Sequence, residues 1–323
     1  MFVFPGALGD FLLALPTLRL LRLRHAPRST TLVTSDALVP LARLAGVADD
    51  YARVDGAASA ALFTDGVLPA WLAGRPVVYS WLGASDPALR ARVASVAVHA
   101  VFARVERGDG PVHAAVAYAR AVGLADRPAA LRAAATLTPA PAARAARLLD
   151  GPPLLVVHAG AGAPRKRWAA AGFAAVASRW RARGGAVAEL VGPAEEGGVL
   201  PDATPVAGWP LADVAALIAR AACWVGNDSG PSHLAGAVGV PGAVVFGPTS
   251  AARWRPFAGR LVAVRSAASA PDGIPIDALP VARVLRACRR ARRAASRLTR
   301  GRGEVTVPRS HEFFAAPALT PRK

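Results

Sequence analysis

The sequence predicts an α/β protein in which helices flank parallel sheets. Two observations support this class, and a third indicates the number of domains. Short β-rich apolar runs alternate with longer segments of helical periodicity. Each half of the chain begins with the same order of strand, glycine turn and helix. With 323 residues the chain exceeds what one core comfortably holds, so we expect two domains, over 1–150 and 151–280, followed by a basic helix and tail over 281–323.

The first half is expected to open with a strand at 2–4, followed by the turn Pro5–Asp10. Leucines then recur at helical spacing from Phe11 to about Arg24. The alternation continues with two strands and two helices, expected at 30–34, 76–81, 36–46 and 113–122 respectively. Residues 125–153 are rich in Ala, Pro and Arg, and we interpret them as the linker between domains.

The second half restarts with a buried strand at 154–157 and a glycine-containing loop at 158–164. A helix at 170–183, a strand at 187–192 and a helix at 211–222 are expected next. The segment that follows is the most informative part of the chain. It predicts, in order, a strand, a polar turn, a short helix and a second strand, over 221–226, 227–233, 232–239 and 243–246.

Composition and charge limit the possible partners. The net charge is +18, which favours anionic partners or reflects a solvated basic surface. Residues 283–302 hold nine arginines and no acid, but no interleaved aromatic residues or reader motif, so we do not expect nucleic acid as a partner. Two cysteines cannot build a disulfide framework and fit a reducing cytosol. No uncharged apolar stretch is long enough to span a membrane, and the N-terminus lacks the basic leader of a signal peptide.

The polar turn after the strand at 221–226 predicts an anion site. Backbone amides at such a turn and at the start of the next helix have no internal partners and carry partial positive charge, so a diphosphate can dock there. Gly230 would let the backbone approach the ligand closely. His233 lies one turn beyond Asp228 and either faces the same ligand or has a structural role.

Three more positions carry possible chemistry. Asp10 lies where a strand ends and a helix begins, as an N-cap or as a catalytic base. Lys166 follows the Gly160-x-Gly162 loop and is either a phosphate contact or part of a solvated face. Glu195, just past the strand at 187–192, is a candidate for ribose hydroxyls or an exposed loop residue.

Several classes of site are not supported by the sequence. No cluster of His and Cys residues has metal-ligand spacing, and no two aspartates stand at i and i+2. The sequence also lacks a serine nucleophile elbow and a glycine-rich loop ending in Lys-Ser/Thr. We therefore expect neither a metal cofactor nor hydrolase or kinase chemistry.

Together these segments resemble glycosyltransferase family 9, the family of the lipopolysaccharide heptosyltransferases. The matching pieces are GALGDFLLALPTLRLLR (6–22), HAAVAYARAVGL (113–124), LLVVHAGAGAPRKRW (154–168), VGPAEE (191–196) and VGNDSGPSHLAGAVGVPGAVVFGPTS (225–250). The resemblance implies a GT-B fold, which is two Rossmann-like domains facing each other across a cleft. It also implies a metal-independent, inverting transferase without a cofactor, which uses a nucleotide-sugar donor and a glycan or glycolipid acceptor. ADP-heptose is the leading donor and a lipopolysaccharide core the leading acceptor.

The resemblance also implies roles for individual residues. Asp10 matches the general base, and Gly9 before it is expected near the donor phosphates. Lys166 matches a phosphate-contacting lysine, and Glu195 lies near the ribose-binding acid. The donor-binding segment of the family is matched by Asp228, Ser229, Gly230 and His233.

Two alternatives stay open at this point, a non-catalytic nucleotide-binding module of the same fold and a nucleotide-sugar epimerase. For a transferase with a lipid-linked acceptor, we expect a cytoplasmic protein whose residues 283–302 dock on the anionic inner face of the bacterial inner membrane.

Overall fold

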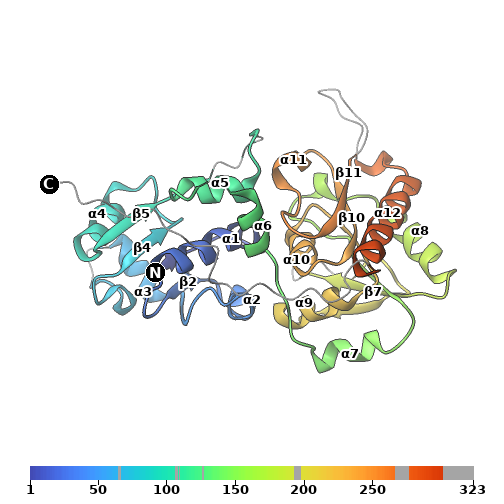
Figure 1. The fold of residues 1–323 in the computed structure, drawn as a ribbon, viewed down its shortest axis with the longest axis horizontal. Coiled ribbons are helices and arrows are strands. Elements are labelled where there is room, and N and C mark those ends of the chain that lie inside the picture. Colours follow the sequence, from blue (N-terminus) through green and yellow to red (C-terminus); the bar gives the residue numbers. More distant parts are fainter. Residues whose placement is uncertain are drawn as a thin grey trace.

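The computed structural model describes residues 1–64, 67–105, 108, 110–125, 127–192, 198–265 and 276–300. It contains two parallel sheets, each covered by helices, in the two halves of the chain (Figure 1). The first has five strands in the order β3-β2-β1-β4-β5, and the second has six in the order β11-β10-β9-β6-β7-β8. The α/β class predicted from the alternation of strands and helices is therefore confirmed.

The N-terminal sheet is centred on β1, a strand of two buried residues, Phe2–Val3. Phe2 pairs with Leu32 on one side and with Tyr79 on the other. The other strands are β2 (Thr31–Thr34), β3 (Asp50–Arg53), β4 (Val77–Ser80) and β5 (His99–Phe102). The helices are α1 (Leu8–His25), α2 (Val39–Ala45), α3 (Ala57–Ala60), α4 (Pro87–Val96) and α5 (Ala114–Ala121), with short 3-10 turns at Asp36–Leu38, Ala61–Phe63 and Ala70–Leu72.

The C-terminal sheet is centred on β9 (Cys223–Asn227), whose five residues are all buried. It pairs in parallel with β6 (Leu154–His158) and β10 (Pro241–Phe246). The outer strands are β7 (Ala186–Val191), β8 (Thr204–Ala207) and β11 (Arg260–Arg265). The helices are α8 (Ala170–Arg181), α9 (Leu211–Arg220), α10 (Gly230–Val238), α11 (Ala251–Trp254) and α12 (Val281–Arg300), with 3-10 turns at Pro164–Lys166 and Ile276–Ala278.

The segment predicted to link the two halves contains two short helices, α6 (Pro128–Ala134) and α7 (Ala143–Leu149). Leu131 of α6 is fully buried, and α7 packs against α9. Between these helices, the amide of Leu137 donates a hydrogen bond to the carbonyl of Ala237 at 2.9 Å. The linker is thus fixed against the C-terminal half at this point.

Helix α12 packs on the C-terminal sheet along one face. Val284, Ala287, Cys288 and Ala291 are buried, and the first three share a hydrophobic cluster with β9 and β10. The arginines on its other face are exposed. No helix in the described part of the chain is both long and apolar enough to cross a bilayer.

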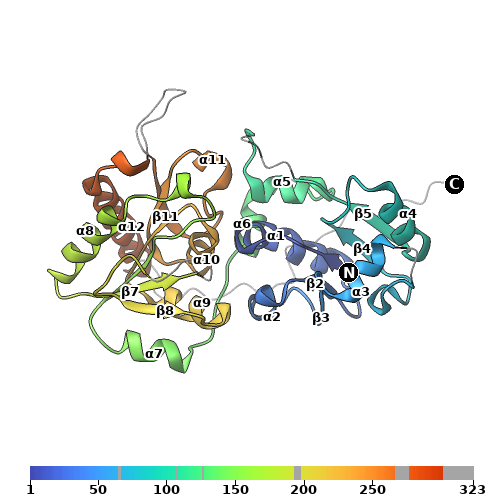
Figure 2. The same ribbon diagram turned by 180° about the vertical axis from the view of Figure 1, so that it is seen from behind.

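The two halves meet through α1 and α10, which pack against each other (Figure 2). One hydrophobic cluster joins Leu18 of α1 and Leu41 of α2 to Leu217 of α9 and Leu234 of α10. Because this interface is apolar and buried, it brings the carboxyl edges of β1 and β9 together.

Candidate functional site

The turn between β9 and α10 is fixed by Asn227. Its side-chain oxygen accepts a hydrogen bond from the amide of Trp168 at 3.0 Å, and its amide nitrogen donates to the carbonyl of Ala159 at 2.6 Å. The carbonyl of Asn227 accepts from the hydroxyl of Ser232 at 2.7 Å. A fully buried amide that satisfies its donors and acceptors in this way holds the loop after β6 against the loop after β9.

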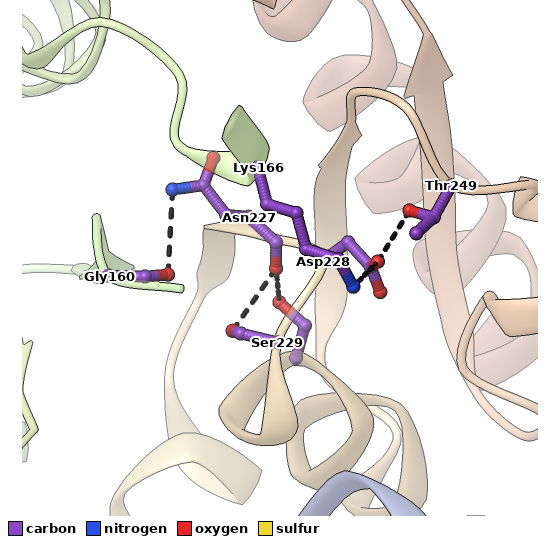
Figure 3. A network of polar contacts seen from close by, with 7 residues as sticks. Gly160, Lys166, Asn227, Asp228, Ser229 and Thr249 are labelled. Atoms are coloured by element: carbon purple, nitrogen blue, oxygen red, sulfur yellow. Dashed lines mark hydrogen bonds and ion pairs between the residues drawn. The ribbon is translucent and has the colours of Figure 1, made fainter. Parts of the chain in front are cut away.

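A buried carboxylate joins three separate segments at this turn. Asp228 Oδ2 accepts hydrogen bonds from Lys166 Nζ at 2.8 Å and from Thr249 Oγ1 at 2.6 Å (Figure 3). Asp228 is only 5% exposed, whereas the Lys166 side chain is 27% exposed. The ammonium is therefore held in place by a buried partner, while part of the lysine side chain is open to solvent.

The basic run before α8 is more than a solvated face. Arg167 donates from Nε and Nη2 to the carbonyl of Ala161, at 3.2 and 3.1 Å. These bonds brace the glycine-containing loop from which Lys166 emerges.

Ser229 is the N-cap of α10 and Gly230 its first residue, so the helix begins two residues before the start at Ser232 that the sequence predicts. The Ser229 hydroxyl lies 3.1 Å from Nδ1 of His158, and its side chain makes no capping bond to the helix. At Gly230, a Cβ would lie 3.0 Å from Cβ of Leu8 and 3.2 Å from the amide nitrogen of Gly9. The missing side chain of Gly230 thus makes room for the first turn of α1, a neighbour that the sequence did not predict.

Gly9 lies on the other side of the same contact. A Cβ there would lie 3.3 Å from Cδ2 of His233 and 3.5 Å from Cα of Gly230. The first turns of α1 and α10 therefore touch at two glycines. The donors of both helix starts carry partial positive charge.

His233 is buried within this contact, with 8% of its surface exposed. Burial lowers the pKa of its imidazole to about 4, opposed by the carboxylate of Asp228 and assisted by the ammonium of Lys166 and, where it is protonated, by His113. His233 is therefore neutral at pH 7, and its imidazole packs at Gly9 without offering a positive charge.

Asp10 does not cap α1, because Ala7 occupies the N-cap position and Asp10 stands in the first helical turn. Asp10 lines a cavity of about 720 Å³, whose other walls include Phe4, Trp81 and Tyr118 of the N-terminal half and Trp254 of the C-terminal half. Only Gly9 separates Asp10 from Leu8, which touches Gly230. A carboxylate beside a cavity of this size can accept a proton from a bound hydroxyl.

Two predicted features need separate comment. Glu195 lies outside the described residues. Among the residues that the structure describes, no group of three or more His, Cys, Asp or Glu side chains is placed to hold a metal ion.

No sequence motif assigns a role to Asn227, Thr249, His158 or Trp254. The signal for Asn227 and Thr249 was positional, since both lie at or just past the carboxyl ends of β9 and β10. No local pattern marks Trp254, because its place at the cavity follows from the packing of the two halves.

Comparison with known proteins gives a consistent result. The family model for glycosyltransferase family 9 (heptosyltransferase) matches residues 73–273. No match was found among curated protein sequences.

Among solved structures, a family 9 glycosyltransferase from Veillonella parvula aligns with a TM-score of 0.72 and 18% identity, over 91% of this chain and 96% of the other. ADP-heptose lipopolysaccharide heptosyltransferase II from E. coli aligns with a TM-score of 0.70 and 16% identity, over 91% and 98%. The E. coli heptosyltransferase WaaC, solved with ADP, aligns with a TM-score of 0.57 and 18% identity, over 90% and 98%. At these identities the likeness shows the fold, and it confirms the predicted GT-B architecture.

Proposed function

The chain belongs to glycosyltransferase family 9, and from this premise we propose that it is an inverting transferase that moves heptose from ADP-heptose to a lipopolysaccharide-core or related glycan. One observation carries the proposal. The contact between Gly9 and Gly230 brings the Asp10 cavity next to the turn of Asp228, whose carboxylate binds the Lys166 ammonium. A base and an anion site on different halves of the molecule are what transfer between two bound substrates requires.

The donor side consists of Lys166 and the first turn of α10. In our proposal the diphosphate lies against the amides at Ser229 and Gly230, with the Lys166 ammonium at its oxygens. Buried Asp228, which also accepts a hydrogen bond from Thr249, holds that ammonium in place, so little reorganisation is needed when charge grows on the leaving nucleotide. His233 contributes packing at Gly9 and keeps the site free of an additional titrating charge.

The acceptor side is the cavity lined by Asp10. Asp10 takes the proton from an acceptor hydroxyl while that oxygen attacks the anomeric carbon from the face opposite the leaving diphosphate. The attack forms the new glycosidic bond and breaks the bond to the phosphate, which inverts the anomeric configuration. Glu195 remains the candidate for the ribose hydroxyls, by resemblance to the family.

We propose that fixed positive charge takes the part that a divalent metal plays in other transferases. The chemistry of the described donor side, one ammonium and helix-start amides, suits a diphosphate directly. Turnover that is unchanged by exhaustive chelation supports this, whereas loss with chelator and recovery with a metal would refute it.

The proposed location is the cytoplasmic face of the inner membrane. The exposed face of α12 includes Arg289, Arg293 and Arg297, which lie together along one side of the helix. Such a face attracts anionic lipid headgroups, and a glycolipid acceptor would be presented at the same surface.

A transfer assay tests the function. Purified protein is incubated with ADP-heptose and a heptose-free lipopolysaccharide core, and products are identified by mass spectrometry and by the NMR coupling of the anomeric proton. We expect one added heptose with inverted configuration. Donor binding without any product would favour the non-catalytic module, and a changed sugar on the nucleotide without added acceptor would favour an epimerase.

A further inference from the structure

The cavity beside Asp10 has an aromatic wall from each half of the molecule. Phe4, Trp81 and Tyr118 form one wall, with ring centroids 5.7 to 6.3 Å apart. Trp254, the last residue of α11, lines the cavity from the C-terminal half and is half-buried. The proposed function gives a role to Asp10 but none to Trp254.

The residues on both sides of Trp254 are tied to the N-terminal half. Arg253 is 5% exposed, and its Nη1 donates to the carbonyl of Val112 at 2.9 Å. The guanidinium carbon of Arg253 also lies 5.1 Å from the centre of the Trp254 ring. On the other side, Nε2 of His113 lies 2.9 Å from the carbonyl of Arg255.

The protonation of His113 fixes the direction of this second bond. Its Nδ1 accepts from the amide of Ala115 at 3.2 Å, so Nε2 carries the proton and donates to Arg255. Burial lowers the pKa of His113 to about 4. The imidazole therefore keeps this tautomer through the neutral range.

The segment that leads to Trp254 is also anchored at its other end, on the donor side. Thr249, five residues earlier, donates to the buried carboxylate of Asp228 at 2.6 Å. Trp254 is thus held by hydrogen bonds at Thr249, Arg253 and Arg255, on an element that is only four residues long. Several hydrogen bonds to the residues around a side chain hold that side chain in one position at a binding site.

We propose that Trp254 is a specificity-determining residue for the acceptor, because its indole stacks on the apolar face of a sugar ring bound in the Asp10 cavity. The inference rests on the proposed function and names the chemistry of the acceptor at that site. A pyranose ring presents C–H bonds on its faces and hydroxyls at its edge. The aromatic walls fit the faces, and Asp10 fits a hydroxyl at the edge.

Saturation-transfer NMR with methyl β-D-glucopyranoside tests the stacking without any donor. Sorbitol, which has hydroxyls but no ring, is the ligand control. The variants are Trp254→Ala, Trp254→Phe and Trp209→Ala. Trp209 is the matched control because it is also half-buried and has a guanidinium, that of Arg144, 5.3 Å from its ring centre, and it does not line the cavity.

We expect saturation transfer to the ring C–H protons of the glucoside in the wild-type protein and about tenfold weaker binding in Trp254→Ala, from the loss of one aromatic contact. Trp254→Phe should keep most of the affinity, and Trp209→Ala should bind as the wild type does. ADP binding by calorimetry checks that each variant is folded. In the transfer assay, Trp254→Ala should raise the KM for acceptor and leave the KM for donor unchanged.

Equal glucoside binding by wild type and Trp254→Ala would overturn the inference. So would a saturation-transfer signal for sorbitol as strong as that for the glucoside, or no such signal for the glucoside. The proposed function fails by a different result, which is a wild-type protein that does not bind ADP-heptose or does not transfer its sugar.

Discussion

Lys166 offers a test in which a structural role and a binding role give different results. Its Nζ lies 2.8 Å from Asp228 Oδ2, and Asp228 is nearly inaccessible to water. Replacing Lys166 with Met would leave the carboxylate hydrogen-bonded to the hydroxyl of Thr249 but without its ammonium partner. Removal of one member of a fully buried ion pair costs about 3–5 kcal/mol. Because the lysine end is partly exposed, water replaces some of the lost interaction, and we expect a loss of about 1–3 kcal/mol in the free energy of unfolding.

The binding role predicts a second and separate effect. A charge-assisted bond from Lys166 to a phosphate oxygen contributes about 1.5–3 kcal/mol, which corresponds to roughly a tenfold to hundredfold weaker Kd for ADP in Lys166→Met. The double variant Lys166→Met/Asp228→Asn removes the uncompensated charge. It should recover much of the lost stability but none of the ADP affinity.

The assays are urea unfolding for stability and calorimetric titration with ADP for affinity. Folded Lys166→Met that binds ADP as the wild type does would refute the phosphate contact. A double variant that recovered ADP affinity together with stability would show that Lys166 acts only by holding the fold.

Three further predictions concern the contact between the halves, His233 and α12. Gly230→Ala should crowd Leu8 and Gly9, lower the rate of sugar transfer more than the affinity for ADP, and cost about 1–3 kcal/mol of stability in urea unfolding. Gly151→Ala is the control, because a Cβ at Gly151 meets open space. Equal behaviour of the two variants would contradict the close contact at Gly230. Because the pKa of His233 is lowered to about 4 in the folded protein, the unfolded chain binds a proton at this imidazole first as the pH falls. The free energy of unfolding should therefore fall between about pH 6.5 and about pH 4, by up to about 1.4 kcal/mol per pH unit. A urea-unfolding series in which His233→Gln shows the full wild-type decline would exclude this imidazole as a source of the pH dependence. Arg293→Glu/Arg297→Glu should reduce sedimentation with vesicles that contain anionic lipid. The control is Arg28→Glu/Arg147→Glu, which changes the net charge equally at two exposed arginines outside α12. An equal loss of sedimentation in the control would show that the membrane is attracted by net charge rather than by α12.

The sequence predicts the central strands of both sheets because these strands are apolar on both faces. The runs at 154–158 and 223–227 are fully buried and bounded by turns. Short, continuous apolar runs of this length predict buried strands. Strands at the margins were missed. β3, with the sequence DYAR, is exposed at both ends, and β8, with the sequence TPVA, has one buried residue. Little apolar patterning distinguishes such strands from loops.

The sequence indicates those candidate site residues whose position follows from local structure. Lys166, Asp228 and Gly230 lie at loops that follow strands, where local geometry already indicates an anion site. The partnership of Asp228 with Thr249 joins residues 21 positions apart, and Trp254 reaches the Asp10 cavity through packing between the halves. Such relationships depend on tertiary structure, so no local pattern could reveal them. Helix α1 also begins at Leu8 rather than Phe11, which places Asp10 inside the first turn.

The most direct test of the proposed mechanism is the rate of a single turnover by Asp10→Asn, measured with saturating donor and acceptor. The substitution keeps the shape of the side chain and removes its ability to accept the proton. We predict a rate about 10²–10⁴-fold below that of the wild type, with ADP affinity unchanged. A rate within a few-fold of the wild type would contradict the assignment of Asp10 as the base, and with it the proposal that the two halves present a carboxylate and an anion site to the same reaction.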